Sequence, residues 1–203
     1  MRSINHETPK NEVYKSLRII FKKLKIKMFR EDGGLMIRRD KGRHYIKIKD
    51  CEVFGANIAY LRAIENMKLY EWADYLEYDR NRLSELEQGW QDIKLSTAVK
   101  IAKKLNKSVA MLFDNSFRDD PKACQSKTYE EADYLQVFSE NASRAINRNE
   151  RNKSQLFSDK REVSARVISR TVHDPRIKTL GWIASALGTT LSELLLTDKE
   201  KKE

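Results

Sequence analysis

The stretch FGANIAYLRAIENMKLYEWADYLEYDRNRLSELEQGWQDIKLSTAVKIAKKLNKSVAMLF, residues 54–113, decides the fold. Its apolar residues recur every three or four positions between short polar breaks, which is the pattern of amphipathic helices. The spacing predicts five short helices, whose core-facing residues are Ile58, Leu61 and Ile64, then Trp72, Ala73 and Leu76, then Leu83 and Leu86, then Leu95, Val99, Ile101, Ala102 and Leu105, and last residues 108–113. Helices this short and close together predict a compact all-α domain.

The third of these helices, residues 80–88, carries the candidate functional face. Asp79 stands before it as a capping residue, and Gly89 ends it. Leu83 and Leu86 face the core, which leaves a polar outward face of Arg80, Asn81, Ser84, Glu85 and Gln88. Arg can bind guanine, and Asn adenine, through two hydrogen bonds in the major groove of DNA. The face is therefore a candidate base-reading surface, and an ordinary solvated helix face is the alternative.

Residues 54–113 resemble, without gaps, the Cro/CI-like (Xre-type, lambda-repressor-like) helix-turn-helix domain. The resemblance rests on Leu61-Arg62, Ala73, Leu76, Leu83-Ser84, Leu86-Glu87, Gly89 and the closing Ile101-Ala102, Leu105, Ser108 and Leu112. It implies that the base-reading residues are Arg80, Asn81, Ser84 and Glu85, and that the residues nearer the phosphates are Lys68, Arg82 and Gln88. It also implies a structural ion pair between Arg62 and Glu87, whose bidentate geometry would hold the third helix in place.

Two features depart from the family pattern. Lys68 and Leu69 stand where the family has a capping residue and a phosphate-binding Gln; Lys68 can replace the phosphate contact, whereas Leu69 cannot. Glu77 stands where the family has Gly between its second and third helices. Because a side chain removes the conformational freedom that glycine has in such a turn, Glu77 must adopt a less comfortable conformation or shift the turn.

Residues 130–196 repeat the arrangement loosely. The segment IKTLGWIASALGTTLSELL (177–195) matches LSTAVKIAKKLNKSVAMLF (95–113) in apolar spacing, and residues 152–155 and 163–170 resemble the start of the second helix and the recognition helix of the same family. The resemblance implies second-domain DNA contacts from Ser164, Arg166, Ser169 and Arg170. The alternative is a degenerate copy that serves dimerisation.

The formal net charge of +10 is concentrated at the N-terminus, because residues 1–50 hold 15 of the 40 Lys and Arg but 6 of the 30 Asp and Glu. Residues 13–28 predict an amphipathic helix, and the apolar pairs Leu35/Ile37 and Ile46/Ile48 predict a β-hairpin around Asp40-Lys41-Gly42. Its basic residues are Arg38, Arg39, Lys41, Arg43, Lys47 and Lys49. They would contact DNA as a wing does, or the hairpin would serve dimerisation.

The predicted fold is mainly α: two tandem five-helix lambda-repressor-like helix-turn-helix domains preceded by an amphipathic helix and a β-hairpin. The expected parts are a basic module (1–52), the first domain (53–114), a linker (115–129), the divergent second domain (130–197) and a charged tail (198–203). No apolar run approaches the roughly 20 residues of a membrane span, and no signal peptide is visible. A cytoplasmic, nucleoid-associated protein is expected.

No constellation typical of an enzyme emerges. His6, His44 and His173 are isolated, and Cys51 and Cys124 lack metal-ligand spacing, so no catalysis, metal or cofactor is expected. The predicted function is a sequence-specific transcriptional regulator, by family habit a repressor, of a bacterium, phage or mobile element. Double-stranded DNA is its expected partner, and a homodimer its expected form. The alternative is an antitoxin or assembly factor that binds a protein through the second domain or the N-terminal module.

Overall fold

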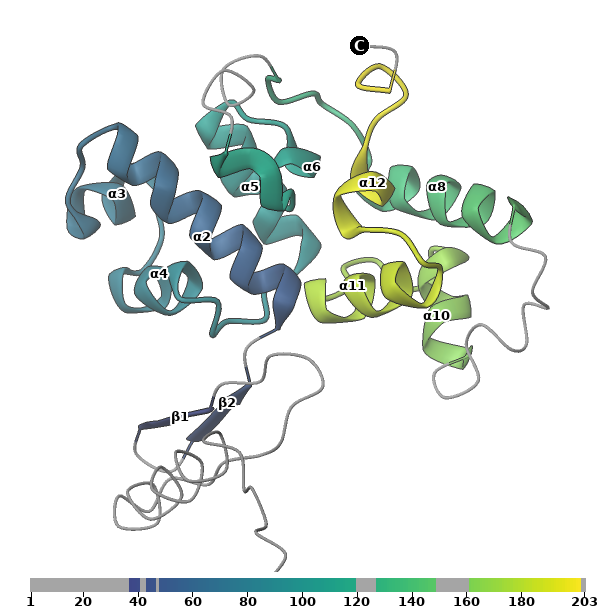
Figure 1. Cartoon of the computed structure of the whole chain (residues 1–203), viewed down its shortest axis with the longest axis horizontal. Helices are drawn as coiled ribbons and strands as arrows, with labels where there is room; N and C mark the ends of the chain where they lie inside the picture. Colours follow the sequence, from purple (N-terminus) through teal and green to yellow (C-terminus); the bar gives the residue numbers. More distant parts are fainter. Residues whose placement is uncertain (1–36, 41–42, 47, 120–126, 149–160, 202–203) are drawn as a thin grey trace, which may run out of the picture. The chain divides into compact units, whose positions relative to one another are not determined.

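A computed structural model describes residues 37–40, 43–46, 48–119, 127–148 and 161–201. Over these ranges the protein is mainly helical, which confirms the α class (Figure 1). The helices are α2 (Lys49–Ile64), α3 (Leu69–Leu76), α4 (Arg80–Glu87), α5 (Leu95–Leu105), α6 (Val109–Leu112), the 3-10 helix η1 (Asn115–Arg118), α8 (Tyr134–Arg148), α10 (Arg161–Ile168), α11 (Ile177–Ala186) and α12 (Leu191–Leu195). Within the described residues, no helix has the length and apolar character that crossing a membrane requires.

The chain divides into two units between Lys47 and Ile48. In the N-terminal unit, strand β1 (Ile37–Asp40) pairs antiparallel with β2 (Arg43–Ile46), and Ile37 stands opposite Ile46. The second strand was expected to include Ile48 and Lys49, which is wrong, because β2 ends at Ile46. Helix α2 begins at Lys49, before the domain boundary expected at residue 53. The carbonyl of Ile48 accepts the N–H of Glu52 at 2.8 Å, so its backbone already belongs to the first turn of α2. The predicted helix at 13–28 lies outside the described residues.

Helix α2 is the central helix of the first repeat, the set α2–α6. Its residues Phe54, Ile58 and Leu61 follow helical spacing and are at most 6% exposed. Ile64 was expected on the same face but is 53% exposed. Six residues turn a helix by about 600°, which leaves Ile64 about 120° from Ile58 around the axis and outside the buried stripe.

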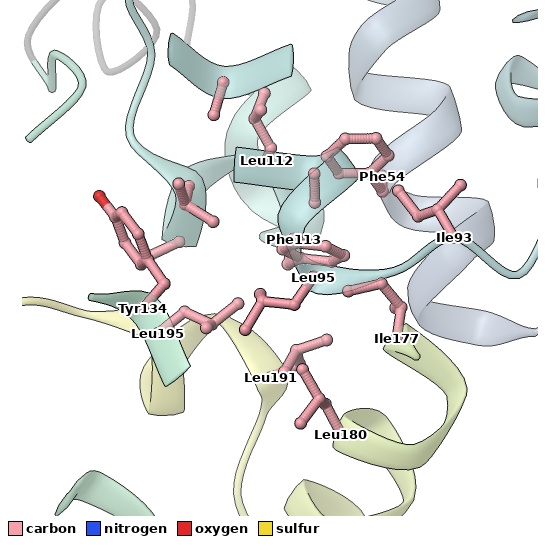
Figure 2. Packing of buried hydrophobic residues seen from close by; sticks show 14 of the residues in the cluster. Phe54, Ile93, Leu95, Leu112, Phe113, Tyr134, Ile177, Leu180, Leu191 and Leu195 are labelled. Carbon is pink, nitrogen blue, oxygen red and sulfur yellow. The ribbon is translucent and has the colours of Figure 1, made fainter. Parts of the chain in front are cut away.

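The second repeat, α8–α12, shares one hydrophobic cluster with the first. Figure 2 shows Leu95 and Phe113 of the first repeat packed with Ile177, Leu180 and Leu191 of the second. The separating segment 115–129 was expected to be a linker without regular structure. Its first residues instead form η1, whose Phe117 is 2% exposed. Residues 120–126 lie outside the described ranges.

A pair of buried asparagines marks equivalent positions in the two repeats. Asn57 of α2 donates its amide N–H groups to the carbonyls of Leu112 and Asp114, at 3.1 and 2.9 Å. Asn141 of α8 donates in the same way to the carbonyls of Leu194 and Leu196, at 3.0 and 2.9 Å. Each asparagine therefore fastens the first helix of its repeat to the end of the last one.

Candidate nucleic-acid interface

Helix α4 is held against α2 by its apolar side and by two close backbone approaches. Leu83 and Leu86 are at most 2% exposed. A Cβ atom added to Gly55 of α2 would lie 2.0 Å from the carbonyl oxygen of Leu86, and one added to Gly89 would lie 2.6 Å from the Cα atom of Glu52. At the other end, Asp79 accepts the N–H of Arg82 at 2.9 Å, which caps the helix. The C-terminal end of α4 is therefore held closely against α2, and the N-terminal end is capped by Asp79.

Arg62 and Glu87 add a polar connection between α2 and α4. The Nε and Nη2 atoms of Arg62 donate to the two carboxylate oxygens of Glu87 at 2.8 and 2.9 Å, and Nη1 donates to the carbonyl of Met67 at 3.2 Å. The hydrogen bond to Glu87 raises the pKa of Arg62. The two planar groups thus meet in the bidentate form, which fixes angle as well as distance.

The outward face of α4 is polar. Arg80, Asn81 and Arg82 are exposed, and Ser84 and Glu85 are half-buried. Gln88 is exposed, but its side chain is already hydrogen-bonded within the helix, since its amide donates to the carbonyl and hydroxyl of Ser84 at 2.9 and 3.0 Å. Three side chains at the first turn are therefore available to a ligand, while Gln88 is turned back along the helix.

At the start of α3, Lys68 is exposed and Leu69 is half-buried against the core. The N–H of Lys68 donates to a carboxylate oxygen of Glu71 at 2.7 Å, and this bond lowers the pKa of Glu71. The Lys68 ammonium lies 6.0 Å from the ring centroid of Tyr70. An exposed cation at this position suits a contact with a phosphate group.

The turn between α3 and α4 passes through Glu77, which adopts the left-handed conformation with φ 52° and ψ 45°. The strain expected from a side chain at this position is therefore present. The carboxylate of Glu77 pairs with Lys104, and this contact lowers its pKa.

Replacing Glu77 with glycine should raise the thermal unfolding midpoint by roughly 2–4 °C, because glycine adopts positive φ without steric cost. Glu77→Ala is the control, since it removes the pair with Lys104 and keeps the backbone strain. Calorimetry of both variants separates the two effects, and an equal midpoint for both would contradict a strained turn.

In the second repeat, Ser164 was expected to contact DNA, and this expectation is wrong because the residue is fully buried. It occupies the position on α10 that Leu83 has on α4, on the side that faces the core. Arg166, Ser169 and Arg170 are exposed. Ser169 and Arg170 line an open hollow of about 450 Å³, and Arg170 donates to the side-chain oxygen of Gln136 at 3.2 Å.

The basic residues expected along the hairpin are only partly described. Arg38 and Arg39 lie in β1 and Arg43 lies in β2. Lys41 and Lys47 fall outside the described residues. Lys49 is the first residue of α2 and is exposed, so it belongs to the helical unit rather than to the hairpin.

Cys51 lies in the core, where burial raises the pKa of its thiol to about 12. It is therefore an inert apolar side chain rather than a nucleophile. Among the described residues, no three His, Cys, Asp or Glu side chains are grouped so that they would hold a metal ion.

Comparisons of this chain with protein-family models, with curated proteins and with solved structures give no match. The features of this chain that bear on its function are therefore α4 and its surroundings.

Proposed function

We propose that residues 53–114 form a helix-turn-helix module that binds double-stranded DNA in a sequence-specific manner. One observation carries the proposal: α4 presents exposed Arg80 and Asn81 on its first turn while its other side is fastened to α2. The major groove is wide enough to admit an α-helix. Arg80 would read guanine, Asn81 adenine, and Ser84 and Glu85 neighbouring base edges.

The contacts to the phosphates come from residues at the margins of this face. Lys68 at the start of α3 and Arg82 on α4 are exposed cations and would set the register on the duplex. The basic hairpin module would add affinity without sequence preference. In this proposal the protein is a transcriptional regulator that acts by occupying DNA, and blocking polymerase is the simplest outcome of occupancy.

The test is a gel shift of the full chain on duplexes recovered by binding-site selection. Arg80→Ala with Asn81→Ala should reduce the preference for the selected sequence over a scrambled one by about tenfold or more, because each bidentate contact supplies about 1–3 kcal/mol of discrimination. The matched control is Asn115→Ala with Arg118→Ala, which removes the same residue types from the exposed side of η1. Equal loss of preference in both variants would refute base reading by α4.

A second candidate function is the binding of a protein partner. Three large hydrophobic side chains favour it: Ile64, Tyr70 and Tyr75 are 53%, 47% and 43% exposed. Isolated exposed hydrophobic residues are common, but three so close in sequence on α2 and α3 are suited to a partner. If the full chain selects no preferred duplex, this second candidate replaces the first.

A further inference from the structure

The N-terminal ends of α5 and α11 exchange backbone hydrogen bonds between the repeats. The N–H of Leu95 donates to the carbonyl of Pro175 at 2.9 Å, and the N–H of Ile177 donates to the carbonyl of Ile93 at 2.9 Å. Lys94 and Arg176 form an antiparallel bridge between these bonds. Residue 93 lies 82 positions before residue 175, and residue 95 lies 82 positions before residue 177. The two bonds are therefore the same contact, made once from each repeat.

The helix caps are exchanged in the same way. Asp174 accepts the N–H and the hydroxyl of Ser96 at 3.0 and 2.8 Å, and Asp92 accepts the N–H of Lys178 at 3.1 Å. Each aspartate thus caps the helix of the other repeat. The residues at the cap positions themselves, Lys94 and Arg176, form no side-chain cap. Each helix therefore receives its N-terminal cap from the other repeat.

A third contact of this interface joins α6 and α12. The hydroxyl of Ser192 donates to the carbonyl of Ala110 at 2.9 Å, and these residues are also 82 positions apart. Apolar side chains from both repeats pack in the shared cluster beside these bonds (Figure 2). A surface that pairs with its own equivalent is the mark of a two-fold dimer interface. Here both copies of the surface belong to one chain.

The two repeats present different residues at equivalent places on α4 and α10. Leu86 and Val167, both buried, occupy equivalent positions, which are 81 residues apart. The same offset places exposed Arg166 where the first repeat has Glu85. The charge at this position is therefore opposite in the two helices.

We propose that a single chain is the DNA-binding unit and that its ligand is a duplex with two unlike half-sites at one fixed spacing. This inference rests on the proposed function. Helix α4 binds one half-site, and Arg166 of α10 together with Ser169, which follows α10, binds the other. The exchanged caps fix the spacing, because they hold the repeats as a pseudo-two-fold pair. A palindrome is not the preferred site, since α4 and α10 carry different side chains.

The first experiment measures how many chains bind one duplex. The untagged full chain is mixed with a larger tagged form, and both are run in a gel shift on a duplex recovered by selection with the full chain. Two bands are expected, one for each form. A third band of intermediate mobility would show two chains on one duplex and would overturn the proposal. Failure to select any preferred duplex would instead refute the proposed function.

The second experiment tests the two half-sites. Inserting about 5 bp between the half-sites should reduce affinity by about tenfold or more, and so should inserting about 10 bp, because either insertion makes the distance between the half-sites longer than the fixed spacing. The 10 bp insertion adds about one helical turn, so it changes the distance and keeps both half-sites on the same face of the duplex. Arg166→Ala should alter preference in one half-site, and Arg80→Ala with Asn81→Ala in the other. Tolerance of either insertion, or an unchanged preference with Arg166→Ala, would overturn the proposal.

The third experiment tests the exchanged caps. Asp174→Ala should weaken binding to the complete site more than binding to a duplex that holds only the half-site read by α4. Asp114→Ala is a closely matched control, since Asp114 accepts the N–H and hydroxyl of Ser116 at 2.9 and 2.8 Å but does so within the first repeat. The same ratio of affinities in the two variants would show that the exchanged caps do not set the spacing.

Discussion

Replacing Leu180 with alanine should lower the free energy of unfolding by about 2–5 kcal/mol, a large part of the roughly 5–15 kcal/mol that stabilises a typical domain. Leu180 is 0% exposed and lies in the cluster shared by both repeats (Figure 2). A cavity there removes packing contacts that the neighbouring helices cannot replace. Urea unfolding measures the loss.

The effect of this substitution should extend to both repeats, because they share one core. Hydrogen–deuterium exchange is expected to accelerate in α3 of the first repeat as well as in α11 of the second. Leu135→Ala, at a half-buried position on α8, is the control and should have a smaller effect. Faster exchange confined to α10–α12 would show that the repeats unfold independently, which contradicts a shared core.

The second large effect is expected at the ion pair between α2 and α4. Glu87→Ala should cost about 1.5–3 kcal/mol, since it removes two hydrogen bonds to a charged group and leaves the Arg62 side chain, which is 26% exposed, without its carboxylate. Because α4 is then less firmly oriented, sequence preference in the gel shift should fall together with stability.

The residues at the equivalent positions of the second repeat indicate a control variant for this prediction. Equivalent positions in α2 and α8 are 84 residues apart, as Asn57 and Asn141 are, so Arg62 corresponds to Ile146. Equivalent positions in α4 and α10 are 81 residues apart, so Glu87 corresponds to Ile168. Ile146 is 7% exposed, and Ile168 packs against the cluster. Arg62→Ile with Glu87→Ile should therefore destabilise less than Glu87→Ala, because no charge loses its partner. A double-mutant cycle measures the coupling, and strictly additive single effects would show that the pair contributes none.

Much of the helical unit follows from local signals in the sequence. The three- and four-residue spacing of Phe54, Ile58 and Leu61 predicts the buried side of α2, and Asp79 predicts the start of α4. The burial of Ser164 was not predicted. A small polar residue at a core position gives no apolar signal, and only the packing of α10 shows that it is buried.

The sequence by itself determined where the helices lie, which side of each is apolar and which polar residues α4 turns outward, because these properties depend on neighbours within a few positions. It also carried the repeated pattern of an aspartate two positions before a basic residue, Asp92/Lys94 and Asp174/Arg176. Only the tertiary structure decided that each aspartate caps the helix of the other repeat and that both repeats share one core. Periodicity shows that a helix buries one face, but the choice of partner depends on packing between residues far apart in the chain.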